Sequence, residues 1–120
     1  MADKIILTGS PLSTGHLYRS KGKIWYMTKT GKERKHQYAW ETKSQWKKPM
    51  IPKDVELAVD ILIYFSDNRK RDWDNYHKIT MDALEGIVME NDSQIKEAHV
   101  IKEVDRENPR TEIVIHSLTD

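Results

Sequence analysis

The feature that most constrains the fold is an alternation of apolar and more polar residues over 55–65, which is followed by a segment whose apolar residues have helical spacing. Apolar residues occupy every second position there, from Val55 to Phe65. A period of two is typical of a strand with one face in a hydrophobic core. From about Asp74 to Gly86 the apolar residues recur at helical spacing, which predicts a helix that ends near Gly86. The chain is therefore expected to pass from a central strand to a helix through the segment between them.

The rest of the chain predicts one α+β domain covering residues 1–120. Strands are expected at residues 4–8, 24–28, 95–104 and 111–116, with a polar loop over residues 11–23. A second helix is expected over about 31–47, capped by Thr28 or Thr30 and stopped before Pro49. Asn108 and Pro109 are expected in a hairpin connection between the last two strands. These elements indicate a mixed or antiparallel sheet with two main helices.

Composition narrows the function classes. The chain has no cysteine, which excludes a disulfide framework and a thiolate zinc site. No apolar run approaches the roughly 20 residues that a membrane span requires, and no secretory signal is evident, so a cytoplasmic protein without membrane contact is expected. Residues 1–53 carry twelve Lys and Arg against three acidic residues, whereas residues 54–120 carry eight against sixteen. A basic half suits phosphate binding, and an acidic half suits a divalent metal.

The segment between the central strand and the following helix carries the chemistry. Three cations, Arg69, Lys70 and Arg71, run directly into Asp72 and Asp74. If this stretch is extended, the two carboxylates point the same way and the intervening tryptophan points opposite, where it could anchor the loop in the core or in a dimer contact. Two such carboxylates make half of a site for Mg²⁺ or Mn²⁺. The pattern favours metal-dependent phosphodiester chemistry on nucleic acid.

A complete site needs further groups, and two candidates lie nearby in sequence. Asp92 precedes the next strand, and the chain is just long enough to return it to the start of the helix. Lys78 follows Asp74 by one helical turn, where a lysine could stabilise the phosphorane or protonate the leaving oxygen. Two plainer interpretations remain open: Lys78 forms an ion pair with Asp74 or Asp82, and the aspartates cap a helix. His77 is expected to be a solvated helix residue.

Residues 69–78 (Arg-Lys-Arg-Asp-Trp-Asp-Asn-Tyr-His-Lys), residues 81–84 (Met-Asp-Ala-Leu) and residues 91–94 (Asn-Asp-Ser-Gln) together resemble the RusA family of Holliday junction resolvases. The resemblance covers roughly residues 55–104. Residues 10–19 are similar to that family's N-terminal loop less faithfully, because Leu12 and Gly15 stand where the family usually has a proline and an asparagine. This difference leaves the role of the loop open.

The resemblance implies a small homodimer that binds four-way DNA junctions and cuts two strands symmetrically with Mg²⁺, or with Mn²⁺ in its place. It implies an acidic triad, an essential lysine and a functional arginine at Asp72, Asp74, Asp92, Lys78 and Arg71. We also expect DNA contacts from cations of the chain, which are Arg69, Lys70, Arg71, Arg19, Lys21 and Lys23. No organic cofactor is expected.

Two other function classes are compatible with the sequence. A catalytically silent protein that binds DNA junctions would need only the basic half of the chain. An adaptor domain would use the aspartates as helix caps and bind no metal. A homodimer is also favoured by apolar residues on both faces of the last two strands, at Val100 and Ile101 and at residues 113–115.

Overall fold

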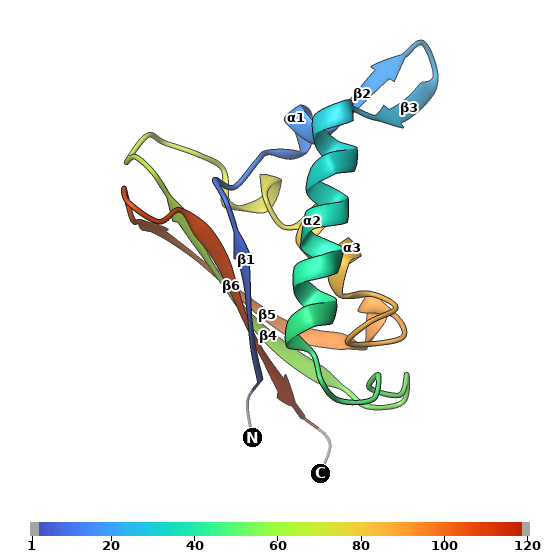
Figure 1. The fold of residues 1–120 in the computed structure, drawn as a ribbon. Coiled ribbons are helices and arrows are strands. Elements are labelled where there is room, and N and C mark those ends of the chain that lie inside the picture. Colours follow the sequence, from blue (N-terminus) through green and yellow to red (C-terminus); the bar gives the residue numbers. More distant parts are fainter. Residues whose placement is uncertain (1–2, 119–120) are drawn as a thin grey trace.

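The computed structural model describes residues 3–118 and contains one mixed sheet with helices on one side (Figure 1). In chain order the elements are β1 (Asp3–Thr8), α1 (Thr14–Leu17), β2 (Tyr18–Lys21), β3 (Ile24–Met27), α2 (Lys29–Gln45), β4 (Leu57–Phe65), the 3₁₀ turn η1 (Trp73–Asn75), α3 (Lys78–Leu84), the 3₁₀ turn η2 (Asp92–Gln94), β5 (Ile95–Val104) and β6 (Arg110–Ser117). The predicted α+β class and the two main helices are confirmed. The prediction of a single domain over residues 1–120 includes positions outside the described residues.

The sheet has the strand order β1-β6-β4-β5. β4 runs antiparallel to β6 and parallel to β5. The parallel pair requires a crossover, and residues 66–94 supply it with η1, α3 and η2. The predicted hairpin at Asn108 and Pro109 is wrong, because β5 and β6 lie on opposite sides of β4. Their connection instead crosses the end of β4, where the amide of Asp105 donates to the carbonyl of Phe65 at 2.8 Å.

The alternation over residues 55–65 places one face of β4 in the core, as predicted. Its buried side chains point toward α2 and α3 and pack with Ile113 and Ile115 of β6. The same register places Leu62 and Ile101 on the opposite face, which carries no helix (Figure 1). The apolar residues of the last strands are therefore divided between a covered face and a bare one. Across residues 3–118, no helix is both long and apolar enough to cross a membrane.

The segment predicted as a polar loop over residues 11–23 contains α1 and the first strand of a β-hairpin. β2 and β3 pair in antiparallel register and are joined by Gly22 and Lys23. Gly22 has φ of +64°, and a positive φ at the first of two central residues is typical of a type II′ hairpin turn. A short polar segment can form a hairpin on this turn chemistry alone, without the apolar alternation that marks a core strand.

The helix α2 begins where the sequence predicts. Thr28 is its N-cap, and its hydroxyl accepts a hydrogen bond from the amide of Gly31 at 3.0 Å. The predicted helix over residues 74–86 is shorter in the structure, because η1 interrupts it and α3 starts only at Lys78. Gly86 follows α3 with φ of +88°, in agreement with its predicted role as the stop.

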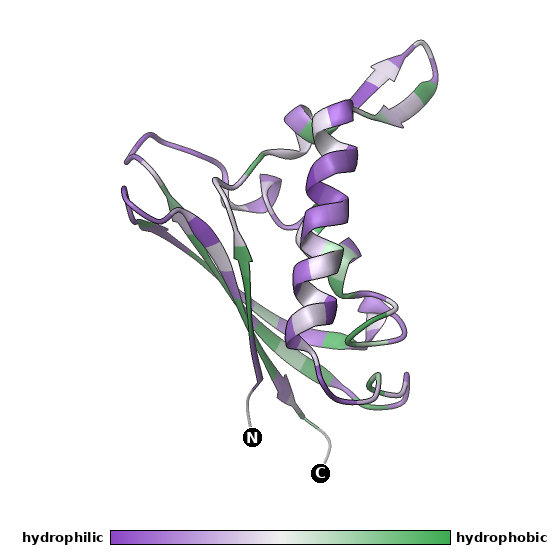
Figure 2. Ribbon diagram, viewed as in Figure 1, coloured by the Kyte–Doolittle hydropathy of each residue, from purple (hydrophilic) through white to green (hydrophobic). Residues whose placement is uncertain are grey.

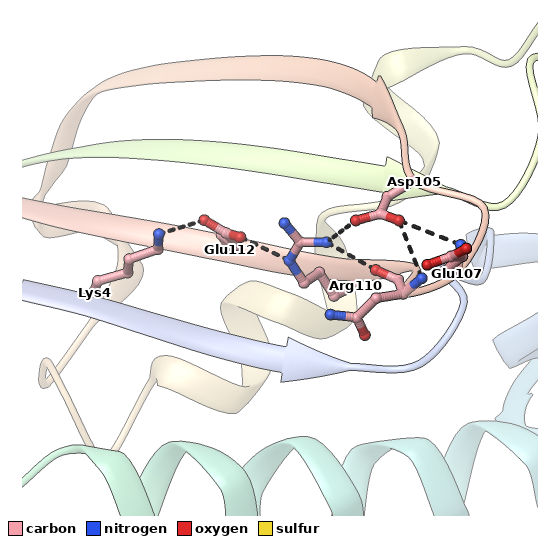
Figure 3. A network of polar contacts seen from close by, with 6 residues as sticks. Lys4, Asp105, Glu107, Arg110 and Glu112 are labelled. Atoms are coloured by element: carbon pink, nitrogen blue, oxygen red, sulfur yellow. Dashed lines mark hydrogen bonds and ion pairs between the residues drawn. The ribbon is translucent and has the colours of Figure 1, made fainter.

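A chain of ion pairs lies along β6 (Figure 3). Glu112 bonds Lys4 at 2.6 Å and Arg110 at 2.7 Å, and Arg110 bonds Asp105 at 2.7 Å. The hydrogen bond from Lys4, followed by that from Arg110, holds the pKa of Glu112 below its usual value despite its burial. We call these four residues the β6 network. Every carboxylate in it is matched by a cation.

Candidate active site

The loop after β4 is organised by Asp67. Its carboxylate accepts from the backbone amide of Arg69 at 3.1 Å and from the guanidinium of Arg71 at 2.7 Å. These bonds, the backbone one first, lower the pKa of Asp67 to about 2. Arg71 also lies over the ring of Phe65 at 4.3 Å, and its side chain is only 13% exposed. Arg71 therefore ties the loop to the sheet, whereas Arg69 and Lys70 are exposed.

The predicted alternation of Asp72, Trp73 and Asp74 is wrong. Asp72 has extended backbone angles, but the chain turns into η1 at the next residue. Side chains in a 3₁₀ turn do not alternate between two sides, so the two carboxylates are not presented as a pair by an extended strand. Trp73 is 56% exposed and so does not anchor the loop in the core.

The structure does bring Asp74 and Asp92 to one place. Both line a cavity of about 330 Å³ beside α3, together with Asp82 and Lys78. Thr14, His77 and Met81 complete its wall. Asp72 is not among the residues that line it. Residues far apart in the sequence therefore meet where α3 begins, which agrees with the expectation that the chain returns Asp92 to the helix start.

Lys78 is positioned at this cavity by two neighbours. Its ammonium group is 3.8 Å from Asp82, and it lies 5.5 Å from the ring of Tyr18. The hydroxyl of Tyr18 donates to Asp82 at 3.2 Å. Burial, and then the charge of Asp82, raise the pKa of Tyr18, so this phenol remains a donor. The ion pair considered for Lys78 thus exists with Asp82, while within residues 3–118 no ion pair joins Lys78 to Asp74.

His77 is not the solvated residue that the sequence predicts. It lines the cavity of Asp74 and a second one of about 320 Å³, which also contains Asp92 and Trp73. Its ring is stacked on Trp73 with centroids 6.4 Å apart, and its Nδ1 is buried with no hydrogen-bond partner in the described residues. The sequence offers one signal for this position, which is its place between an aromatic residue and Lys78 in the acidic segment.

The donor set of the cavity suits a hard divalent cation, because three carboxylates line it beside one imidazole, and no thiolate is present. Within residues 3–118, no three acidic or histidine side chains already form a complete metal-binding group. Mg²⁺ is commonly held by one or two carboxylates, with water and substrate phosphates filling its other positions. Asp74 and Asp92 therefore fit such an ion in kind.

The cations predicted to contact DNA near the N-terminus lie on the β2–β3 hairpin. Arg19 and Lys21 are on β2, Lys23 is in the turn, and all three are exposed. The hairpin is connected to the cavity by Tyr18, the first residue of β2. The sequence placed these cations in a loop with no defined relation to the acidic segment. In the structure, the hairpin that carries them is connected to the cavity through Tyr18.

Comparison with known proteins identifies the family of the chain. A family model described as endodeoxyribonuclease RusA matches residues 9–116. The chain is similar to the crossover junction endodeoxyribonuclease RusA of Aquifex aeolicus (strain VF5), with 38% identity over 68 residues. This match covers 56% of the chain and 52% of the relative, so the chain spans about half the length of the curated protein it matches. Because the family model covers most of the chain, including the whole acidic segment and the hairpin, the protein belongs to the RusA endodeoxyribonuclease family.

Proposed function

We propose that this protein is a metal-dependent endonuclease that recognises four-way DNA junctions and hydrolyses phosphodiester bonds in them. The observation that carries the proposal is the cavity at the start of α3, where Asp74, Asp92 and Lys78 meet. Family membership supports the reaction class. DNA as the substrate is supported by the exposed cations of the acidic segment and of the hairpin that Tyr18 connects to the cavity.

Each residue has a proposed part in the reaction. Asp74 and Asp92 would hold Mg²⁺, or Mn²⁺ in its place. Asp72 would add a third carboxylate, and within residues 3–118 no hydrogen bond or ion pair holds its side chain elsewhere. The bound ion would lower the pKa of the attacking water and offset charge on the phosphoryl group. Lys78 would donate to a phosphoryl oxygen or to the leaving oxygen.

The cations divide into two groups in this proposal. Arg69 and Lys70 are exposed near the acidic segment and would bind phosphates of the cut strand. Arg71 would act indirectly, because its guanidinium already bonds Asp67 and the carbonyls of Asp67 and Arg69. Its part is to fix the conformation of the loop from which Asp72 and Asp74 project.

We further propose a homodimer, because two symmetric cuts need two sites. The outer edge of β1 is closed to a partner, since Gln45 of α2 both donates to the carbonyl and accepts from the amide of Ile6 at 2.7 Å. No strand in the described residues pairs with the outer edge of β5. Ile101, Val104 and Trp73 are exposed beside that edge. Pairing of β5 with its copy would bury these groups.

The dimer is tested by light scattering at micromolar concentration, where the wild type is expected at twice 14.1 kDa. Ile101→Asp should shift the protein to monomer. Ile6→Asp is the matched control, because Ile6 is also exposed and lies in register with Ile101 across the sheet, but at the β1 side. A monomeric wild type that still resolves junctions would remove the dimer from the proposal.

The activity is tested with a synthetic four-way junction and a linear duplex of matched sequence, each incubated with Mg²⁺ and with EDTA. Paired, metal-dependent cuts in the junction are expected, with the duplex left intact. Tight junction binding without cleavage in any divalent ion would instead identify a silent junction-binding protein. Neither binding nor cleavage would favour the adaptor domain.

A further inference from the structure

We infer that the β2–β3 hairpin recognises the branch point itself, with Trp25 stacking on a base that the crossover leaves unstacked. This inference rests on the proposed function and adds to it how a junction is told from a duplex. The hairpin projects beyond the end of α2, away from the sheet (Figure 1). It is therefore free to reach into a substrate that lies against the cavity.

The hairpin exposes an unusual run of apolar side chains. Ile24, Trp25 and Tyr26 are consecutive in β3 and are 69%, 72% and 49% exposed. Figure 2 shows this strand standing apart from the core, green beside the turn and pale along most of its length. None of the three belongs to the hydrophobic core, so the fold does not explain them. Contiguous exposed apolar groups of this kind mark an interaction site.

The surrounding charge identifies the partner as nucleic acid. Arg19 is paired in register with Tyr26, and Lys21 with Ile24, so one face of the hairpin combines cations with apolar groups. Trp25, paired with Ser20, lies on the other face of the hairpin, which it shares with Tyr18. Lys23 extends the charge at the turn, and residues 18–30 contain no acidic residue. A binding surface that combines cations for phosphates with aromatic rings for bases is typical of proteins that hold unpaired nucleotides.

The hairpin is held firmly at its base, so its tip has a defined place relative to the cavity. The amide of Thr28 donates to the carbonyl of Leu17 at 2.9 Å, and the hydroxyl of Thr28 donates to the carbonyl of His16 at 2.9 Å. At Gly31 the helix approaches Leu17 so closely that a side chain would collide with its carbonyl. Tyr18 connects the same base to Asp82 in the cavity wall.

The register fixes how far Trp25 lies from that connection. Trp25 is opposite Ser20, two residues along β2 from Tyr18. Two strand residues span about 7 Å, which is close to two steps of about 3.4 Å along a DNA strand. A base stacked on Trp25 would therefore be only a few nucleotides from a phosphate in the cavity. This spacing suits cleavage beside a branch point.

A duplex offers no such base. Its bases are stacked on both sides, and extracting one costs unstacking and unpairing energy, whereas a base that is already unstacked costs least. At a crossover the strands exchange partners, so a base there can offer one face to a ring. Trp25 would therefore contribute affinity for the junction and almost none for the duplex.

The test compares Trp25→Ala with Trp40→Ala, binding each to a four-way junction and to a matched duplex in EDTA. Trp40 is the matched control because it is 71% exposed but lies on α2, outside the hairpin. Trp25→Ala should lose about tenfold in junction affinity, in the range for one base–aromatic stack, with duplex affinity unchanged. Trp25→Tyr should retain most of the affinity, and Trp40→Ala should match wild type.

A second readout follows the base directly. With 2-aminopurine at the branch point, wild-type protein should change its fluorescence, and Trp25→Ala should not. If wild type prefers and cuts junctions but Trp25→Ala binds them equally well, the inference is overturned while the proposed function stands. If Trp25→Ala changes the mass in light scattering, the hairpin is a contact between subunits, which also overturns it. A wild type without junction preference would instead refute the proposed function.

Discussion

The molecule concentrates charge in two regions that differ in how the carboxylates are matched. In the β6 network, Glu112 and Asp105 each bond a cation at 2.6–2.7 Å (Figure 3). Of the carboxylates that line the cavity beside α3, Asp82 alone has a cation of residues 3–118 within 4 Å. The side chains of Asp72, Asp74 and Asp92 make no hydrogen bond or ion pair with any residue of 3–118. The carboxylates of the β6 network are therefore paired with cations, whereas those of Asp72, Asp74 and Asp92 have no partner among residues 3–118.

This difference separates stability from function. Carboxylates paired with cations contribute to folding, because the pairing favours their charged form. Neighbouring carboxylates without partners repel one another and contribute nothing of the kind, so such a group is expected where a ligand completes it. The acidic cavity should therefore respond to metal and substrate. The β6 network should respond to denaturant and acid.

The largest expected effect is on catalysis. Asp74→Asn should lower junction cleavage by at least about 10³-fold, because a bound metal ion supplies several kcal/mol of transition-state stabilisation. Junction binding should persist or tighten, since one negative charge near phosphates is removed. Single-turnover cleavage of a labelled junction in Mg²⁺ measures the first quantity, and anisotropy in EDTA measures the second.

Glu112→Gln is the matched control for that experiment, because it removes the same charge from the β6 network. It should cut at the wild-type rate when the protein is folded. Near-wild-type cleavage by Asp74→Asn would remove this residue from the active site. An equal loss of cleavage in both variants would mean that the β6 network matters as much for catalysis as the cavity does.

The second effect is on stability. Glu112→Gln should lower the free energy of unfolding by about 1–3 kcal/mol, because it removes the charged acceptor of Lys4 and leaves Arg110 with Asp105 as its one charged partner in the network. Urea unfolding at neutral pH measures it. Glu97→Gln provides the control, since Glu97 is exposed on β5. Asp74→Asn should change stability little. A loss as large as that of Glu112→Gln would mean that Asp74 also stabilises the fold.

Acid should weaken the same network. The pKa of Glu112 is lowered from 4.5 in the folded protein, mainly by the hydrogen bond from Lys4, and that of Asp105 is lowered by the bond from Arg110. The unfolded chain therefore binds protons more readily, and stability falls as the pH drops below about 4.5. Unfolding curves between pH 6 and pH 3 should show a shallower loss for Glu112→Gln than for wild type.

How much the sequence predicts differs between the same two regions. The strand over residues 55–65 and the start of α2 at Thr28 follow from local signals, which are an alternation and a cap. The grouping of Asp74 with Asp92 was accessible through chain length. The strand order was not, because whether β6 pairs with β4 or with β5 depends on packing against the helices and not on any local pattern.

Two features of the site lay outside sequence reasoning for a physical reason. A 3₁₀ turn at Trp73 replaces the extended segment, and no local rule separates the two in a run of charged residues. The burial of Arg71 against Phe65 depends on a contact formed only when the loop folds back on the sheet. The sequence therefore located the charged residues, while the division into paired and unpaired groups required the structure.

The fourth prediction concerns metal alone. Mg²⁺ at ten times its Kd should stabilise the wild type by about 1.4 kcal/mol, because the ion binds the folded cavity and not the unfolded chain. Differential scanning calorimetry with and without Mg²⁺ measures this effect. Glu112→Gln should keep the increment, although its starting stability is lower. Asp74→Asn and Asp92→Asn should lose it, and an unchanged increment in both would mean that the metal binds elsewhere.

The smallest effect separates two neighbouring cations. Lys70 is exposed, whereas Arg71 is bonded to Asp67 at 2.7 Å and covers Phe65. If Lys70 binds a phosphate, Lys70→Ala should reduce the slope of log affinity against log salt by about 0.7–0.9, the amount that one contact contributes. Its stability should not change, because an exposed side chain loses no packing.

Arg71→Ala should leave the slope nearly unchanged but lower the denaturant midpoint, because it removes the ion pair with Asp67 and exposes the ring of Phe65. Binding titrations from 50 to 200 mM salt, combined with unfolding of both variants, decide between these outcomes. If Arg71→Ala flattens the slope as much as Lys70→Ala does, the Arg71 guanidinium leaves Asp67 to bind a DNA phosphate. The Arg71–Asp67 ion pair would then be one that the substrate replaces, and not a fixed part of the fold.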